Sequence, residues 1–319
     1  MKKQPVFNLR AVLVIFLLAS ICAGRANAQT TSLRWKFAKS DQFEIAIEQT
    51  SKLETEADLV KQNIETSSAV KFSWLVQELD AKGIAQIDMV IQSVQLKVTM
   101  PVSNGVRTLE VDTAATPEAK PDVQETEMLQ NLQTVVGKTI RLQVTDRGEI
   151  ISVELDAATK DAIRQTPQSM QIRQMLTDDG LRELFASGAP ILPENKIKTG
   201  ESWTVDKDFA NPAGQFRREQ KLTWLGNETH DNVAQEKIDV TARLSLLSPA
   251  PSPAPPSEVA TKLAIKSQNT TGTIWFDSEK GMITASAVKS SLVTESPYRD
   301  KAIVTRINSQ VELKVSRVK

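Results

Sequence analysis

Strict alternation of apolar and polar residues is the feature that most limits what this chain can fold into. The clearest run lies near the C-terminal end, where Ile303, Thr305, Ile307, Ser309, Val311, Leu313 and Val315 occupy every second position over thirteen residues. A period of two places the apolar side chains on one face of an extended strand, whereas a helix needs a period of about 3.6. Similar runs recur along the chain, so we expect a fold dominated by antiparallel β-sheet, with this final strand tied into it.

Two details of these runs predict local geometry. Between Ile87 and Val98 the apolar phase shifts by one residue at Gln92-Ser93, which is typical of a β-bulge. Asn104-Gly105 is the strongest hairpin-turn dipeptide in the chain, and Asp146-Arg147-Gly148 predicts a second turn. We therefore expect long strands joined by tight turns.

Helical patterning is confined to two places. Asp122 and Glu125 form a capping-box pattern that opens a helix near residues 122–136. Residues 157–190 are rich in Ala, Gln, Arg and Leu but are interrupted by Pro167, which predicts two or three short helices that act as a connector. The apolar residues that these helices are expected to turn inward are Met170, Met175, Leu181, Leu184 and Phe185.

The sequences on either side of this connector resemble each other. Lys71-Phe72-Ser73-Trp74-Leu75 matches Lys221-Leu222-Thr223-Trp224-Leu225, and the block from Thr139 to Ile150 matches the block from Thr273 to Ile283 in the same order. Internal duplication explains this order. Chance similarity between alternating strands is the alternative.

The sequence therefore predicts an α+β fold, mainly antiparallel β, built from two similar curved halves. Residues 29–156 form the first half, residues 157–190 the helical connector and residues 191–319 the second half. A duplication of this kind would give two similar sheets with a pseudo-symmetric interface. Five prolines within residues 248–257 predict an exposed loop in the second half, because proline lacks the amide donor that a sheet needs.

Residues 1–28 are expected to be a cleaved secretory signal. They combine a basic start, an apolar run from Ala11 to Cys22, and Ala26-Asn27-Ala28 before Gln29. The apolar run has only about 12 residues, whereas a membrane-spanning helix needs about 20. We therefore expect a periplasmic or extracellular protein without a transmembrane span once the signal is removed.

The composition after residue 28 excludes several kinds of chemistry. Loss of residues 1–28 leaves 35 basic and 39 acidic residues, a net charge of about −4, which gives no reason to expect a nucleic-acid partner. The only cysteine, Cys22, lies inside the signal, and Ile21 before it disfavours lipid attachment. With a single histidine, His230, and no cysteine after the signal, we expect no transition-metal site and no cofactor.

No catalytic motif stands out. His230 lies in a polar cluster, residues 227–232, which predicts an exposed hairpin loop rather than a catalytic triad. Ser-x-x-Lys occurs at Ser68–Lys71 and at Ser286–Lys289, but positions three apart in a strand lie on opposite faces. We expect a protein that is not an enzyme. A hydrolase that uses two carboxylates brought together by the fold is the alternative.

The remaining candidate for a site is apolar. The tryptophans fall mostly on strand-alternation positions, where they either fill the core or line a cavity for an apolar ligand beneath the helices of residues 157–190. The candidate lining residues are Trp35, Trp74, Trp203, Trp224 and Trp275.

Three passages carry a family resemblance. They are Thr145–Ile150, the stretch from Ile191-Leu192-Pro193 to Thr199–Trp203, and Ile274–Asp277 with Gly281. In these passages the chain resembles a family of uncharacterised exported bacterial proteins that are grouped only as a domain of unknown function, so the resemblance implies no activity. A curved antiparallel sheet backed by helices also looks like periplasmic lipoprotein carriers.

Together these observations predict a non-enzymatic cell-envelope protein of the binding or scaffolding type. Its partner would be an apolar small molecule or another envelope protein. An apolar cavity larger than about 300 Å³ would favour a ligand carrier, and a cleft with two converging acids would favour the carboxylate hydrolase.

Overall fold

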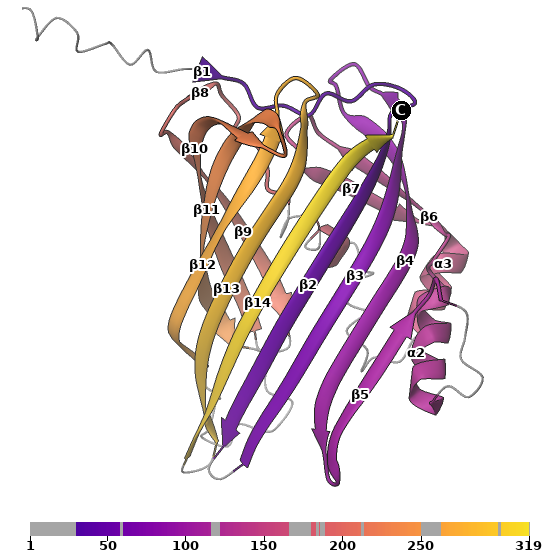
Figure 1. The fold of residues 1–319 in the computed structure, drawn as a ribbon, viewed down its shortest axis with the longest axis vertical. Coiled ribbons are helices and arrows are strands. Elements are labelled where there is room, and N and C mark those ends of the chain that lie inside the picture. Colours follow the sequence, from indigo (N-terminus) through magenta and orange to yellow (C-terminus); the bar gives the residue numbers. More distant parts are fainter. Residues whose placement is uncertain are drawn as a thin grey trace, which may run out of the picture.

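The alternating sequence forms one large antiparallel sheet. The structure is a computed structural model, and it describes residues 30–57, 60–115, 122–165, 180–182, 185, 189–211, 214–249, 263–298 and 301–318. Within these residues the sheet has 12 strands in the order β7-β6-β4-β3-β2-β14-β13-β12-β11-β10-β9, with β5 beside β4, and it curves strongly (Figure 1). The predicted signal, residues 1–28, lies outside the described residues.

In chain order the strands of this sheet are β2 (Gln42–Ala57), β3 (Val60–Leu79), β4 (Ala85–Val102), β5 (Gly105–Asp112), β6 (Thr139–Val144), β7 (Ile150–Leu155), β9 (Ser202–Asn211), β10 (Gly214–His230), β11 (Val233–Pro249), β12 (Ala264–Asp277), β13 (Met282–Tyr298) and β14 (Lys301–Val318). Two short strands, β1 (Thr30–Thr31) and β8 (Ile197–Lys198), pair separately. The prediction of a mainly antiparallel β fold is confirmed.

The last strand lies in the middle of the sheet. β14 pairs with β13 on one side and with β2 on the other, from Ile303 opposite Ala57 to Val318 opposite Gln42. Strands from residues 29–156 and from residues 191–319 therefore belong to one sheet, and the expectation of two separate sheets is wrong. The physical reason is that two separate sheets would leave backbone N–H and C=O groups unpaired along an edge strand of each sheet. In the single sheet, β14 pairs with both β13 and β2, so none of these three strands has an unpaired edge at this position.

The predicted bulge and hairpin turns are confirmed. Lys71 pairs with Ser93 and Phe72 with Ile91, which leaves Gln92 as the extra residue. The β4–β5 hairpin turns between Val102 and Gly105, and Gly105 has a positive φ of 131°. The bulge restores the apolar phase, so apolar side chains before and after it lie on the same face of the sheet.

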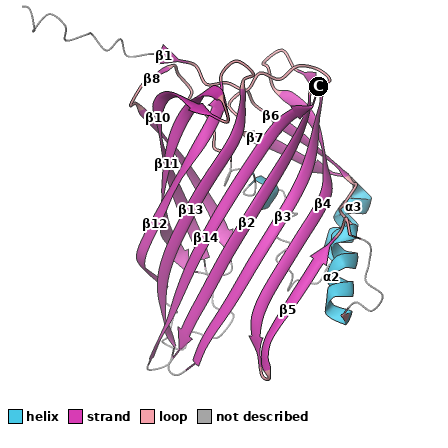
Figure 2. Cartoon of the chain, viewed as in Figure 1, coloured by secondary structure: helices cyan, strands magenta, loops and turns pink. Residues whose placement is uncertain are grey.

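Two helices lie beside one edge of the sheet (Figure 2). The predicted capping box forms at the start of α2 (Val123–Gln133), where Asp122 and Glu125 satisfy each other's backbone N–H groups. The second helix, α3 (Ala157–Gln165), opens the predicted connector. Leu181 and Phe185 are buried as expected. The predictions for Pro167, Met170, Met175 and Leu184 fall outside the described residues, as do residues 250–257 of the predicted proline-rich loop. Ser248 and Pro249 belong to β11 and pair with Gln215 and Gly214, so the loop prediction is wrong for these two residues at the end of that strand.

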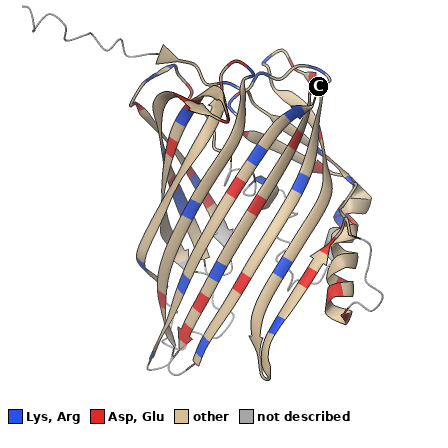
Figure 3. Cartoon of the chain, viewed as in Figure 1, with Lys and Arg blue, Asp and Glu red and all other residues tan. Residues whose placement is uncertain are grey.

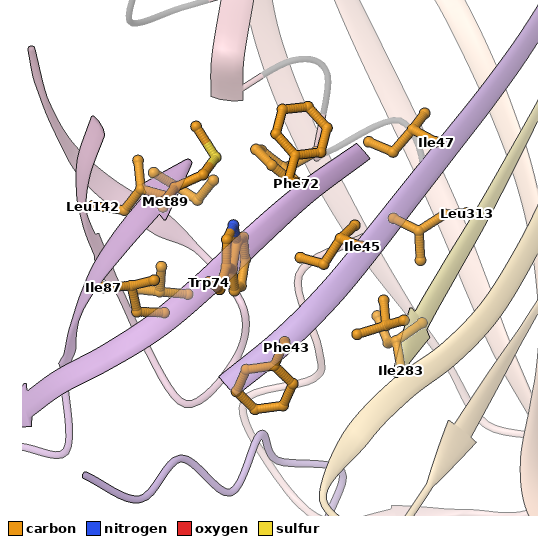
Figure 4. Packing of buried hydrophobic residues seen from close by; sticks show 14 of the residues in the cluster. Phe43, Ile45, Ile47, Phe72, Trp74, Ile87, Met89, Leu142, Ile283 and Leu313 are labelled. Carbon is orange, nitrogen blue, oxygen red and sulfur yellow. The ribbon is translucent and has the colours of Figure 1, made fainter. Parts of the chain in front are cut away.

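The core lies on one face of the sheet, which we call the inner face. Apolar side chains from β2, β3, β4, β6, β13 and β14 meet there (Figure 4). Residues 33–37, which we call the N-terminal strap, cross one end of this core. The backbone N–H of Trp35 donates to the oxygen of Asp146 at 2.7 Å, and that of Lys36 donates to the oxygen of Gly281 at 2.8 Å. The strap therefore ties the β6–β7 turn to the β12–β13 turn.

Asp277, at the end of β12, stabilises the second of these turns. Its side chain is only 3% exposed. It accepts a hydrogen bond from the backbone N–H of Lys280 at 2.8 Å and pairs with the ammonium of Lys280 at 3.0 Å. Burial by itself would raise the pKa of Asp277, but these interactions with Lys280 outweigh it, so the pKa lies below its ordinary value of 3.8.

This pKa shift predicts a pH dependence of stability. A carboxyl whose pKa is lower in the folded state stabilises the fold above the unfolded pKa, and that contribution is lost as the pH falls through the folded pKa. The substitution D277N should therefore lower the free energy of unfolding by about 1–3 kcal/mol at neutral pH, with a smaller loss in acid below the ordinary pKa. Urea denaturation at both pH values tests this, with E44Q on the exposed side of β2 as the control. Equal losses at the two pH values would contradict the assignment.

Candidate functional site

Charged residues on five neighbouring strands lie on one face only, except near the two ends of β14. The strands are β4, β3, β2, β14 and β13, and Lys, Arg, Asp and Glu are spread along them (Figure 3). By alternation and register, every one of these residues on β2, β3, β4 and β13 lies opposite to Phe43 and Trp74, on the face we call outer. The same holds for β14 between Ile303 and Val315. Over these described stretches the inner face is uncharged.

The inner face has two zones along the strands. In the first, the packed zone, side chains such as Ile45, Phe72 and Ile87 are between 0% and 3% exposed. Phe185 closes over them, with its ring centroid 5.2 Å from that of Phe72. In the second, the open zone, the inner-face side chains are only half-buried. The open zone consists of Ser51, Leu53, Thr55, Ile64, Thr66, Ser290, Leu292, Thr294, Thr305, Ile307 and Ser309.

Strand register orders the open zone into rows across the sheet. Leu292, Ile307, Leu53 and Ile64 are successive partners and form an aliphatic row. Rows of hydroxyl side chains flank it, one of which contains Ser290, Ser309, Ser51 and Thr66. With about 4.8 Å between strands, such a row of four side chains spans about 14 Å. The zone therefore offers an apolar band with uncharged hydrogen-bonding groups on both sides.

The five candidate tryptophans do not line one space. Trp35, Trp74 and Trp224 are 6%, 5% and 0% exposed and fill the packed zone. Trp203 is half-buried on β9, and its indole N–H donates to the oxygen of Ile191 at 2.9 Å. Trp275 lies on the outer face of β12. The structure brings Trp35 and Trp74 together, with ring centroids 6.4 Å apart, and places Trp275 on the opposite side of the sheet.

Two of the buried indole N–H groups have no acceptor among the described residues. These are the Nε1 atoms of Trp35 and Trp74, whereas Nε1 of Trp224 donates to Glu236 at 2.9 Å. Trp35 packs tightly on Gly148, where a Cβ atom would lie 2.7 Å from the indole Nε1. This contact uses the ring for packing rather than for hydrogen bonding, and it requires a glycine in the β6–β7 turn.

His230 is the last residue of strand β10 and does not lie in the exposed loop that the sequence predicts. The hairpin turn consists only of Asp231 and Asn232, with φ values of 50° and 62°, so β10 continues to His230. A two-residue turn with two positive φ angles matches the twist of the flanking strands, which explains the short connection. The imidazole of His230 stacks on Trp275 with 4.3 Å between centroids and 3° between planes, and the ammonium of Lys237 lies 5.5 Å from the Trp275 ring. The loop prediction for His230 is therefore wrong.

The two Ser-x-x-Lys pairs are split between the faces as predicted. Ser286 is 4% exposed on the inner face, while Lys289 is exposed on the outer face, and Ser68 and Lys71 are divided in the same way. No group of three or more His, Cys, Asp or Glu side chains within the described part of the chain is arranged to hold a metal ion. No helix among the described residues has both the length and the apolar character needed to span a membrane.

Comparison with solved structures finds only weak similarity. Lipovitellin, in a structure of its lipid–protein interactions, aligns with 10% identity and a TM-score of 0.46 over 88% of this chain, which spans 25% of the lipovitellin chain. The translocator domain of the autotransporter NalP from Neisseria meningitidis aligns with 7% identity and a TM-score of 0.21 over 95% of both chains. The COG4313 outer membrane channel from Pseudomonas putida F1 aligns with 8% identity and a TM-score of 0.23, covering 88% of this chain and 97% of the channel. Similarity this weak carries no information about function.

Sequence comparison is more specific. No curated protein matches this chain. Residues 82–283 match a family of unknown function, DUF6263. The matched region contains all three passages that suggested the resemblance, Thr145–Ile150, Ile191–Trp203 and Ile274–Gly281, and it covers more than half of the sequence. The chain therefore belongs to the DUF6263 family of unknown function.

Proposed function

We propose that this protein is a non-enzymatic binding protein of the cell envelope and that its open zone holds the apolar part of a lipid-like ligand. The observation that carries the proposal concerns five long strands with a charged outer face. Their inner face is uncharged along β2, β3, β4 and β13 and between Ile303 and Val315 of β14. Desolvating a charged side chain costs several kcal/mol, so its exclusion from a whole face favours contact with something other than water. Half-buried aliphatic surface of this kind typically marks an interaction site.

The chemistry of the open zone supports an amphipathic ligand. The aliphatic row of Leu292, Ile307, Leu53 and Ile64 offers contact to an acyl chain or a comparable hydrocarbon. The hydroxyl rows on either side donate and accept hydrogen bonds without charge, which suits ester or hydroxyl groups. In this proposal the buried tryptophans anchor the packed zone, and the ligand lies beyond them along the same strands.

The envelope location in this proposal rests on residues 1–28. Their basic start, short apolar run and Ala26-Asn27-Ala28 support export from the cytoplasm. Binding a lipid-like ligand would be a suitable task there, because envelope lipids must cross an aqueous space with their hydrocarbon covered. A periplasmic and an extracellular site of action are both compatible with this address.

We also propose that the two halves arose by duplication. A similar turn precedes the first long strand of each half, Ala38–Asp41 before β2 and Lys198–Glu201 before β9. In both turns the last residue donates its N–H to the oxygen of the first residue, at 3.0 Å and 2.9 Å. In both, the acidic side chain accepts the N–H of the first residue, at 2.7 Å and 2.8 Å. The third residue has a positive φ in each, 70° in Ser40 and 85° in Gly200.

A pair of neighbouring substitutions on β13 tests the ligand proposal. Leu292 lies on the inner face and Val293 on the outer face of the same strand. L292E would place a carboxylate in the aliphatic row, so the amount of bound lipid should fall at least about tenfold because burying an unpaired charge is costly. V293E adds the same charge on the other side and should leave the lipid in place.

The measurement is native mass spectrometry of the full chain purified from its own cells, followed by lipid extraction. We expect a lipid adduct on the unsubstituted chain and on V293E, and its loss from L292E. A clean ligand-free mass for the unsubstituted chain would sink the proposal, as would equal lipid retention by both variants. Turnover of an envelope substrate by the purified chain would favour the carboxylate hydrolase instead.

A further inference from the structure

A second site lies on the outer face, on the opposite side of the sheet from the open zone. It is a groove of 690 Å³ across β12, β13, β14, β2, β3 and β4. Every residue that lines it is polar, although the side chains of Ser51, Thr66, Ser290 and Ser309 belong to the open zone on the inner face. The lining residues are Thr50, Ser51, Lys52, Glu65, Thr66, Ser67, Lys97, Thr99, Asn269, Thr271, Lys289, Ser290, Ser291, Asn308, Ser309 and Gln310. This composition differs from that of an ordinary ligand pocket, which is mostly apolar.

Strand register arranges most of these side chains into two adjacent rows. One row contains Thr99, Glu65, Lys52, Asn308, Ser291 and Asn269, and the other contains Lys97, Ser67, Thr50, Gln310, Lys289 and Thr271. Each row crosses six strands, which corresponds to about 24 Å at the usual strand spacing. The groove is therefore long enough for an oligomer and too long for a single small anion.

The charges in the groove are mostly positive and regularly placed. Three lysines and one glutamate line it. Lys97 lies on β4, Lys52 on β2 and Lys289 on β13, so neighbouring lysines are two strands apart in the sheet, or about 10 Å. The lining side chains alone carry a net positive charge, and the carboxylates of Glu54 and Glu110 lie beside the groove, paired with Lys52 and Lys97. Three cations at even spacing along a polar groove match a ligand with repeated negative charges.

Existing ion pairs leave these lysines available. Lys52 pairs with Glu54 at 2.9 Å and with Glu65, which lines the groove, at 4.0 Å, and its side chain is 45% exposed. Lys97 pairs with Glu110 at 2.8 Å, and its side chain is 53% exposed. Exposed ion pairs of this type contribute little to stability, so a ligand with several anionic groups can compete for the ammonium groups. Lys289 has no acidic partner among the described residues.

We propose that this groove binds an extended anionic polysaccharide. The serine, threonine, asparagine and glutamine side chains supply donors and acceptors for sugar hydroxyls, and the lysines pair with the carboxylates of successive acidic sugars. A neutral glycan would lack that charge pairing, and no aromatic ring lines the groove for a sugar to stack on. The same absence of aromatic side chains disfavours single-stranded nucleic acid, whose bases stack on such rings.

The site is independent of lipid binding, because it lies on the other face of the sheet. The test is isothermal titration calorimetry of the full chain with hexagalacturonate, a hexamer of an acidic sugar, at low and at physiological salt. We expect binding that weakens as salt rises. Maltohexaose, a neutral hexamer, and monomeric galacturonate should bind much more weakly.

Two triple variants distinguish binding in this groove from general attraction of the ligand to a charged protein surface. K52Q/K97Q/K289Q removes the three groove lysines and should weaken hexagalacturonate binding at least about tenfold, because three charge-assisted contacts are lost. K71Q/K221Q/K314Q makes the same charge change at exposed lysines of β3, β10 and β14 outside the groove and should leave the affinity within about twofold. Unchanged thermal unfolding of both variants shows that the sheet is intact.

Three results would overturn the proposal. The first is an absence of hexagalacturonate binding by the unsubstituted chain. The second is an equal loss of affinity in the two triple variants, which would indicate general attraction to a charged surface. The third is equal or tighter binding of hexathymidylate, which would identify a nucleic-acid site. L292E changes the open zone and does not touch the residues that line the groove. The lipid proposal and the polysaccharide proposal can therefore fail independently, and each failure can be recognised.

Discussion

Replacing Trp224 with alanine is expected to lower the free energy of unfolding by about 5 kcal/mol, the largest effect of any single substitution we predict. Trp224 is 0% exposed, and removing a buried tryptophan side chain leaves a cavity whose cost is about 3–5 kcal/mol. Its indole N–H also donates to Glu236 at 2.9 Å. Glu236 is itself only 4% exposed and would keep the hydroxyl of Ser278, at 3.0 Å, as its remaining donor. Weakening the hydrogen bonding of a buried carboxylate adds about 1–3 kcal/mol.

Urea denaturation measures this loss, and two further variants apportion it. W275A removes the same side chain from the outer face, where Trp275 is half-buried against His230, and should cost only about 1–2 kcal/mol. W224F keeps most of the ring but removes the N–H donor. The lost N–H group is a donor to the buried carboxylate of Glu236. If W224F is unstable because this carboxylate loses its donor, removing the charge as well should recover stability, so W224F/E236Q should be more stable than W224F alone. Equal destabilisation by W224A and W275A would mean that the inner-face core is not what holds the sheet.

Substitution of Gly148 by alanine is expected to be the second largest effect, about 3 kcal/mol. Gly148 has a φ of 82°, and an added Cβ atom would lie 2.7 Å from Nε1 of Trp35. The left-handed backbone conformation costs a non-glycine residue about 1–2 kcal/mol. The indole of Trp35 is rigid and only 6% exposed, so the clash must also displace the N-terminal strap.

Gly83 supplies a matched control for this prediction. Its φ is 79°, nearly the same as that of Gly148, but nothing lies within 4 Å of an added Cβ atom. G83A should therefore report the backbone cost by itself, about 1 kcal/mol, and the difference between the two variants reports the clash with the strap. W35L should relieve part of the loss in G148A because it removes the overlapping ring. Equal losses in G83A and G148A would mean that the strap contributes little to stability.

How much of the fold was predictable depends on how local the signal is. The bulge at Gln92 and the capping box at Asp122 were predicted from a few neighbouring residues, because each depends on backbone geometry over one or two turns of the chain. The strand from Ile303 to Val315 was also predicted, but its place in the middle of the sheet was not. That place depends on pairing with β2, at the other end of the chain, and alternation alone does not select a partner.

The tryptophans show the same limit at single residues. Ile274-Trp275-Phe276 is a run of three apolar residues, so alternation does not decide which of them face the core. The structure buries Ile274 and Phe276, each 1% exposed, and Trp275 therefore lies on the outer face. His230 was assigned to a loop for a related reason. The polar residues around it masked a strand whose outer face is polar.

The two candidate sites were the least predictable features. The uncharged inner face can be recognised in the sequence only after the faces are aligned across strands. The outer groove combines Lys52, Lys97 and Lys289, which are far apart in the sequence, and Lys97 and Lys289 each lie two strands from Lys52 in the sheet. A serine, threonine or asparagine at an alternate strand position indicates only an exposed face. Its neighbours across the sheet decide whether that face is a binding site.

The sequence by itself determined that the chain forms long antiparallel strands, which side chains of each strand share a face, and where the turns and the bulge fall. The tertiary structure alone decided that all long strands join one sheet with β14 in its middle. It also decided that the inner face of this sheet carries an uncharged zone and the outer face a polar groove lined by three lysines. The reason is that the direction of a side chain is set by its own backbone. The neighbour across a strand is set by the burial and hydrogen bonding of residues far apart in the chain.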